Sequence, residues 1–71
     1  MHIGHEIRKE LKRQGRTVVW FAKTLPCNRS TAYDIFNRPT IDTEQLSRIC
    51  KLLNHNFFVD LQHETQNNLQ K

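Results

Sequence analysis

Polar side chains suited to recognising another molecule gather in the middle of this 71-residue chain. Arg29 and Ser30 directly follow Asn28, and Tyr33 and Asp34 come one helical turn later. An arginine fork can donate two parallel hydrogen bonds to O6 and N7 of guanine, and a carboxylate can accept from the amino group of cytosine. A tyrosine ring can contact a thymine methyl group or donate to phosphate. These residue types and spacings therefore favour hydrogen bonding to base edges.

Neighbouring residues extend this set towards the phosphate backbone. Thr31 lies between the inward and outward faces of the expected helix, where it can contact the backbone. Asn37 and Arg38 follow the helix at a point where the chain can meet phosphate. The complete set of expected DNA-binding residues is Thr17, Asn28, Arg29, Ser30, Thr31, Tyr33, Asp34, Asn37 and Arg38.

Two short helices must position these side chains. An apolar stripe with the i, i+3, i+4, i+7 spacing of one helical face precedes them: Val18, Phe21, Ala22 and Leu25. We expect Thr17 to cap this helix and Pro26 to end it, because proline removes a backbone donor and disfavours helical geometry in the preceding residue. Asn28 then caps a second helix over about residues 29–37, which turns Ala32, Ile35 and Phe36 inward.

The remaining sequence predicts three more helices and no strand. Ile3, Ile7 and Leu11 recur every fourth residue before Gly15, a residue typical of helix ends. A later helix, capped by Asp42 or Thr43, carries the stripe Leu46, Ile49, Cys50 and Leu53 and ends at Asn54. A short last helix spans about residues 57–62. We therefore expect an all-α fold of five helices, with one domain over residues 1–64 and a disordered polar tail over residues 65–71.

Charge is distributed unevenly along the chain. The net charge is +4, and residues 1–38 carry eight Lys and Arg against three acids, whereas residues 39–71 carry three against four. A positive half that contains the expected reading helix favours attraction to phosphate. The longest apolar run, Val18 to Ala22, is far shorter than the roughly 20 residues that span a bilayer. We expect a cytoplasmic protein without a membrane partner.

Cysteine and histidine positions do not predict a metal site or a catalytic one. Cys27 and Cys50 form no CxxC pair and are expected to be reduced, inward-facing thiols. His2 and His5 lack a nearby third ligand, whereas zinc usually takes three or four protein ligands. No nucleophile, base and orienting group recur at a recognisable spacing. We expect no enzyme activity, no cofactor and no metal.

Adjacent aromatic rings near the C-terminus predict a contact surface. Phe57 and Phe58 point about 100° apart on a helix, so one core can hardly bury both rings. We expect a homodimer through Phe57, Phe58 and Leu61. The alternative is that one ring caps the core beside Ile41.

The order of these elements resembles the phage Cro and lambda-repressor family, also called the XRE family. The resemblance covers roughly residues 3–62: Thr17 starts the second helix, Phe21 and Ala22 take the place of the family's Leu-Ala, and Ile35 is the inward residue of the reading helix. Pro26 stands where the family usually has Gly. The resemblance implies a helix-turn-helix that reads the major groove, commonly as a two-fold dimer.

Two functions follow as expectations. The first is sequence-specific binding of double-stranded DNA by a transcriptional regulator, a repressor that acts by occupying its operator. The second is a protein-interaction module on the same scaffold, similar to an antitoxin or an antirepressor, which binds a partner protein through Phe57, Phe58 and Trp20.

Overall fold

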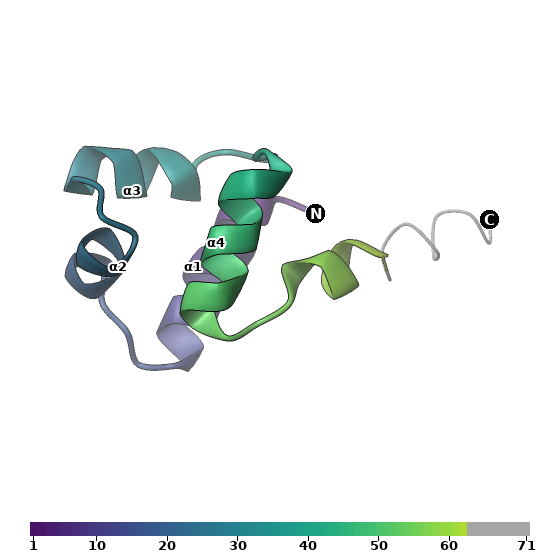
Figure 1. Cartoon of the computed structure of the whole chain (residues 1–71), viewed down its shortest axis with the longest axis horizontal. Helices are drawn as coiled ribbons and strands as arrows, with labels where there is room; N and C mark the ends of the chain where they lie inside the picture. The colour runs from purple at the N-terminus through teal and green to yellow at the C-terminus, as the bar shows by residue number, and fades with distance from the viewer. Residues whose placement is uncertain (63–71) are drawn as a thin grey trace.

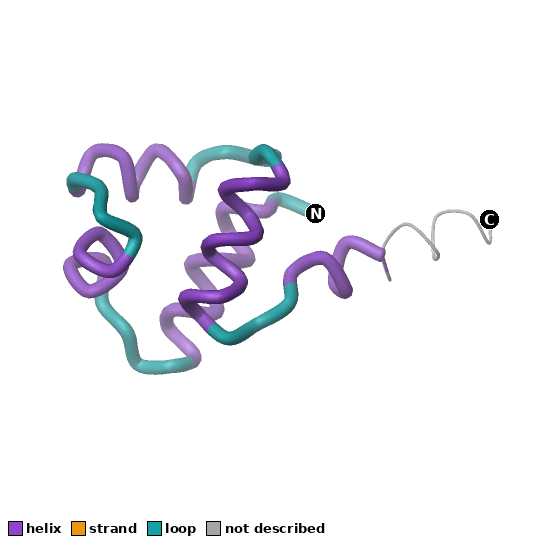
Figure 2. Tube along the Cα trace, in the orientation of Figure 1, coloured by secondary structure: helices purple, strands orange, loops and turns teal. Residues whose placement is uncertain are grey.

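Helices built from the apolar stripes of the sequence form the whole of the described fold. The structure is a computed structural model that describes residues 1–62. Its helices are α1 (Ile3–Arg13), α2 (Val18–Thr24), α3 (Arg29–Phe36) and α4 (Thr43–Leu53), followed by a helical segment over residues 57–62 (Figures 1 and 2). No strand occurs within residues 1–62. The all-α class is confirmed, whereas the expected tail over residues 65–71 lies outside the described residues.

Each of the four labelled helices begins with a side-chain cap, which satisfies one of the backbone N–H groups left unpaired in a first helical turn. Nδ1 of His2 accepts from the backbone N–H of His5 at 3.2 Å. Thr17 Oγ1 caps α2 and Asn28 Oδ1 caps α3, at 3.0 and 2.8 Å. Asp42 Oδ1 caps α4 at 2.7 Å. Asp42, rather than Thr43, is therefore the cap of α4.

The helix ends also follow from local chemistry. Gly15 adopts a φ of 71°, and the next N–H, that of Arg16, reaches back to the Leu11 carbonyl at 2.9 Å. Asn54 ends α4 with a φ of 52°, a left-handed conformation that asparagine tolerates better than most residues. Helix α3 ends at Phe36, one residue before the predicted end, because Asn37 takes the C-cap position.

The core joins all five helical segments around fully buried aromatic rings. Phe21, Phe36 and Phe57 are at most 1% exposed, and the rings of Phe21 and Phe36 lie 5.3 Å apart between centroids. The other buried apolar residues are Ile3, Ile7, Leu11, Ala22, Ala32, Ile35, Leu46, Ile49 and Leu53. Cys27 and Cys50 are free thiols, half-buried against this core.

A backbone seam holds the start of α1 against the end of α3. The N–H groups of Ile3 and Gly4 donate to the carbonyls of Pro39 and Arg38 at 3.1 and 3.0 Å. A Cβ atom on Gly4 would lie 2.3 Å from the Phe36 carbonyl oxygen, so only glycine permits this approach. Figure 1 shows the N-terminus beside the chain that connects α3 to α4. The exit of α3 is thereby fixed against the first helix.

Candidate nucleic-acid interface

Helices α2 and α3 are joined by a short turn that places α3 at one edge of the molecule (Figure 1). Leu25 is the C-cap of α2, and the N–H of Cys27 returns to the Ala22 carbonyl at 2.8 Å. Asn28 then starts α3 through its bond to the Thr31 N–H. Pro26 and Asn28 therefore act as the sequence predicts, one at the end of α2 and the other at the start of α3.

Helix α3 has one buried and one exposed face. Ala32, Ile35 and Phe36 are at most 1% exposed and hold the helix against the core. Every residue of α3 expected to bind DNA lies on the exposed side: Arg29, Ser30, Thr31, Tyr33 and Asp34. The inward and outward division predicted from the spacing is confirmed. The exposed side presents a guanidinium, two hydroxyls, a phenol and a carboxylate.

Arg29 has no ion pair with an acid among residues 1–62. The acidic residues of that range that are paired contact other cations, and Asp34 is engaged by Arg38. Arg29 is the first residue of α3, and its side chain is exposed to solvent. Its guanidinium is therefore available to a ligand without first breaking an internal contact.

Asp34 and Arg38 are paired with each other. Nε and Nη2 of Arg38 donate to the same carboxylate oxygen of Asp34 at 3.1 and 2.7 Å. Both side chains remain about half exposed, at 58% for Asp34 and 52% for Arg38. The sequence analysis lists Asp34 and Arg38 as separate candidates, whereas in the structure the guanidinium of Arg38 is engaged by the Asp34 carboxylate and offsets its charge.

The Tyr33 ring is partly exposed and packs against the buried ring of Phe36. Its side chain is 45% exposed, and its ring lies edge-on to Phe36 with centroids 6.1 Å apart. The phenol makes no hydrogen bond within the described part of the chain. Tyr33 therefore contacts the buried Phe36 while nearly half of its surface faces solvent.

The flanking candidates have structural roles as well as exposed positions. The hydroxyl of Thr17 caps α2, and the backbone N–H of Asn37 bonds to carbonyls in the last turn of α3. The guanidinium of Arg16 lies 4.5 Å from the centroid of the Trp20 ring, and Trp20 is half-buried against the core. Arg16 has no paired acid among residues 1–62, and it was absent from the sequence-based set.

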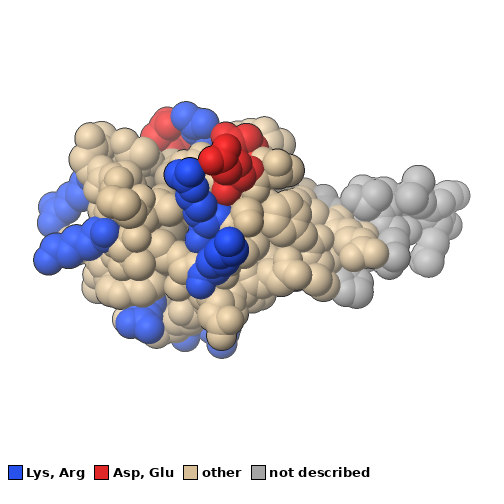
Figure 3. Space-filling model, in the orientation of Figure 1, with Lys and Arg blue, Asp and Glu red and all other residues tan. Residues whose placement is uncertain are grey.

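Charge differs between the two ends of this surface. In Figure 3 basic side chains project alone from the end formed by α2 and the start of α3, whereas acidic and basic side chains adjoin over the end of α3 and over α4. The pairs Arg38–Asp34 and Arg48–Glu44, at 2.7 and 2.9 Å, account for the mixed region. The start of α3 is therefore the more positive end of the face shown.

A second polar cluster, which the sequence interpretation missed, joins the ends of α1 and α4. The carboxylate of Glu10 accepts from Nε and Nη2 of Arg13 and from the Gln14 amide, whose Nε2 also donates to the Leu53 carbonyl at 2.8 Å. Nδ1 of His55 lies 3.8 Å from Glu10. Glu10 follows Ile7 by three residues, which places it on the inward face of α1, so the apolar spacing itself contains a signal for this buried acid.

The electrostatics of Glu10 follow from these bonds. The pKa of the Glu10 carboxyl is lowered from 4.5 to about 2, mainly by the hydrogen bond from Arg13 and also by the Gln14 amide, against the opposing effect of burial. The same bond raises the pKa of Arg13. His55 also bonds to Asp60 at 2.8 Å, so the cluster reaches the segment over residues 57–62. The charged groups of this cluster are therefore engaged in contacts within the folded chain.

The aromatic pair near the C-terminus divides between core and surface. Phe57 is 1% exposed, whereas Phe58 is 38% exposed and Val59, which the sequence interpretation did not select, is 42% exposed. Leu61 is half-buried against the core. Of the three residues expected at a dimer interface, Phe57 is therefore engaged in the core and Phe58 presents the outward ring.

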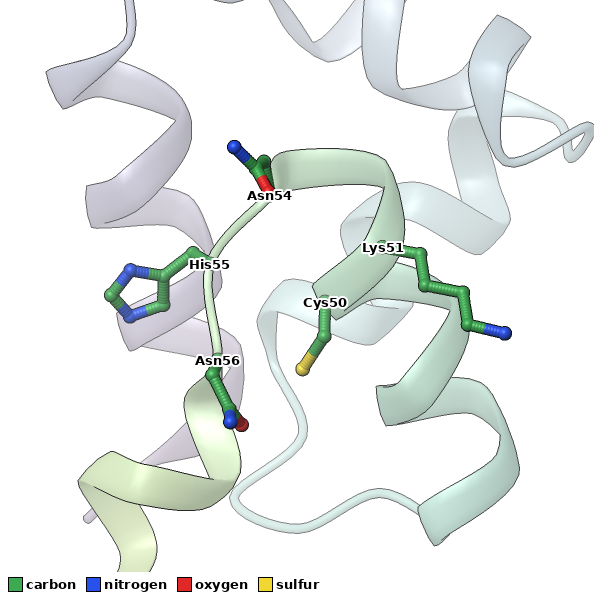
Figure 4. A pocket seen from close by; sticks show the side chains of 5 residues that line it. All are labelled: Cys50, Lys51, Asn54, His55 and Asn56. Atoms are coloured by element: carbon green, nitrogen blue, oxygen red, sulfur yellow. The ribbon is translucent and has the colours of Figure 1, made fainter.

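A shallow hollow near the end of α4 does not form a convergent site. It measures about 310 Å³ and is lined by Cys50, Lys51, Asn54, His55 and Asn56. Figure 4 shows that Lys51 points away from the hollow and that His55 points towards α1. Within the described part of the chain no three His, Cys, Asp or Glu side chains are grouped to hold a metal ion.

Comparisons with known proteins identify no relative of this chain. Protein-family models, curated proteins and solved structures were compared with the chain, and none of them matches it. None of the helices within residues 1–62 has the length and apolar character needed to cross a bilayer.

Proposed function

We propose that this chain is a sequence-specific binder of double-stranded DNA, a member of the lambda-repressor-like helix-turn-helix class, that regulates transcription in the cytoplasm by occupying an operator. In this proposal α2 and α3 form the helix-turn-helix, and α3 enters the major groove. Arg29 and Ser30 contact base edges, and Tyr33 contacts a thymine methyl group or phosphate.

The observation that carries this proposal is the state of Arg29. It is exposed at the start of a helix whose opposite face is anchored by three buried residues, and it has no ion pair among residues 1–62. Side chains near the start of a reading helix are the ones that reach base edges. A rigid helix that presents a free guanidinium at that position meets the geometric need for reading guanine.

Selection from a randomised duplex pool tests this proposal. The purified chain is incubated with the pool at physiological salt, where unspecific binding is expected to be weak, at roughly 10⁻⁴ to 10⁻⁶ M. Enrichment of one motif is the expected result, and an inverted repeat would in addition indicate a dimer. Retention of DNA without enrichment, vanishing smoothly as salt rises, would overturn the proposal.

A second candidate, a protein-interaction module, is favoured by the exposed apolar pair Phe58 and Val59. Monomeric proteins expose single apolar residues commonly, but two adjacent ones on a short helix extend a contact surface. A Phe58→Ser, Val59→Ser double variant separates the two functions. It would abolish partner binding by an interaction module, whereas a monomeric DNA reader would keep both its motif and its affinity.

A further inference from the structure

Helix α1 carries a basic surface that belongs to neither of the functions above. His5, Arg8, Lys9 and Lys12 follow the i, i+3, i+4, i+7 spacing of one helical face and line a shallow hollow of about 260 Å³. We call these four residues the α1 stripe. At 1.5 Å per residue the stripe extends roughly 10 Å along the helix, long enough to meet more than one phosphate of a DNA strand.

Two cations of the α1 stripe are free of internal pairing. Arg8 and Lys12 have no ion pair with an acid among residues 1–62, whereas Lys9 contacts Glu6 at 3.3 Å. Glu6 and Lys9 offset each other, so the net charge of the surface comes from Arg8 and Lys12. Both side chains are exposed, so an anion can approach them directly.

The α1 stripe continues from the outer face of α3. The guanidinium of Arg8 lies 5.7 Å from the centroid of the Phe36 ring, and the ring of Tyr33 lies 6.1 Å from the same centroid. The backbone bonds from Ile3 and Gly4 to the exit of α3 hold the two helices in this relation. Contact of Arg8 with the aromatic ring also orders the guanidinium before any ligand arrives.

We propose that the α1 stripe binds the phosphate backbone of DNA beside the groove that α3 enters, with Arg8 and Lys12 as the phosphate-contacting residues. This inference rests on the proposed function, since it uses the same duplex. The first helix of a helix-turn-helix crosses the phosphate backbone, and the backbone bonds between α1 and the exit of α3 hold the α1 stripe near the same duplex. Cations at that place fix the register of the protein and carry no sequence information.

The salt dependence of binding tests this inference. Affinities of the wild type, Arg8→Gln and Lys12→Gln are measured over a range of salt concentrations, for the selected motif and for a scrambled duplex. Each phosphate contact contributes about 0.9 to the slope of log affinity against log salt on B-DNA. We expect each variant to reduce the slope by about 0.9 and to lower the affinity for both duplexes by the same factor.

Lys51→Gln is the matched control. Like Arg8 and Lys12, Lys51 is an exposed cation without an ion pair among residues 1–62, but its side chain points away from α1 (Figure 4). We expect its slope to equal that of the wild type. Circular dichroism checks that all three variants keep their helices. An unchanged slope in Arg8→Gln and Lys12→Gln, or an equal reduction in Lys51→Gln, would overturn the inference.

Failure of this inference is distinguishable from failure of the proposed function. If the chain selects a motif and the α1 variants keep the wild-type slope, the α1 stripe is not a phosphate contact although DNA is read. If no motif is selected but both variants lower the slope, the α1 stripe binds the backbone and α3 does not read sequence.

Discussion

The charged side chains at the junction of α1 with α4 are paired with one another, whereas the arginine at the start of α3 has no ion pair within residues 1–62. At the junction, Glu10 is bound by Arg13 and Gln14 and approached by His55. At the start of α3, Arg29 has no acidic partner among residues 1–62. Charge that is paired in the folded chain serves stability, whereas charge left free is available to a ligand. The comparison therefore predicts that variants of the junction change stability and variants of the α3 face change binding.

The largest effect is expected at the backbone seam that holds the start of α1 against the end of α3. Gly4→Ala places a Cβ 2.3 Å from the Phe36 carbonyl oxygen and 2.5 Å from that of Ile35, and neither backbone group can move freely. Overpacking of this kind costs about 1–3 kcal/mol and occasionally more. We expect Gly4→Ala to lower the free energy of unfolding, measured by urea titration, by at least about 3 kcal/mol.

Gly15→Ala is the control for the seam. Gly15 has a φ of 71° but no atom within 4 Å of an added Cβ, so only the backbone strain of about 1–2 kcal/mol applies. A loss in Gly4→Ala no greater than that in Gly15→Ala would contradict the close approach of α1 to α3.

The next effect compares two glutamates that both pair with arginine on a helix. The Glu10 side chain is 8% exposed, whereas the Glu44 side chain, paired with Arg48, is 79% exposed. Hydrogen bonds to a charged group contribute about 1.5–3 kcal/mol, and an exposed i,i+4 pair contributes at most about 0.5 kcal/mol. We expect Glu10→Ala to lower the free energy of unfolding by about 1.5–3 kcal/mol and Glu44→Ala to lower it by at most about 0.5 kcal/mol. Equal losses would remove the distinction between the two sites.

On the α3 face we expect a loss of binding without a loss of stability. Arg29→Ala should weaken binding to the selected motif by about 1–3 kcal/mol and relax the preference at one base pair, because a bidentate contact to guanine discriminates by that amount. Fluorescence anisotropy with single-base variants of the motif measures both effects. Thermal unfolding serves as the control, and a substantial drop in melting temperature would place Arg29 among the structural residues.

The last prediction concerns the pH dependence of the junction. The pKa of Glu10 lies at about 2 in the folded chain and at 4.5 in the unfolded reference, so the folded state favours the carboxylate. This contribution to stability is complete above pH 4.5 and is lost as the pH falls towards about 2. We expect the urea midpoint of the wild type to fall across this window more than that of Glu10→Gln. Parallel curves for the two proteins would show that Glu10 does not titrate with a lowered pKa.

Apolar spacing was sufficient to predict the helices, and cap preferences predicted Thr17 and Asn28, whereas the His2 cap of α1 was not predicted. Stripes at i, i+3, i+4 and i+7 placed α2 and α4, and the cap preference of Asn28 located the start of α3. These features are local, because a helix closes its hydrogen bonds within four residues. Glu10 was missed for the opposite reason. Its position three residues after Ile7 places it on the inward face of α1, but the approach of His55 to Glu10 and the bond from Gln14 to the Leu53 carbonyl join residues distant in sequence, which no local pattern brings together.

The sequence by itself determined the all-α class, the bounds of α2, α3 and α4 to within one residue, and the exposed side of α3. Only the tertiary structure decided which residues meet across the fold. The Asp34–Arg38 pair joins residues four apart in the chain and is local. The contacts of His55 with Glu10 and of the Gln14 amide with the Leu53 carbonyl instead join distant residues, and the tertiary structure sets them because they depend on how the helices pack. The tertiary structure also brought the α1 stripe beside α3, through a seam that only Gly4 allows.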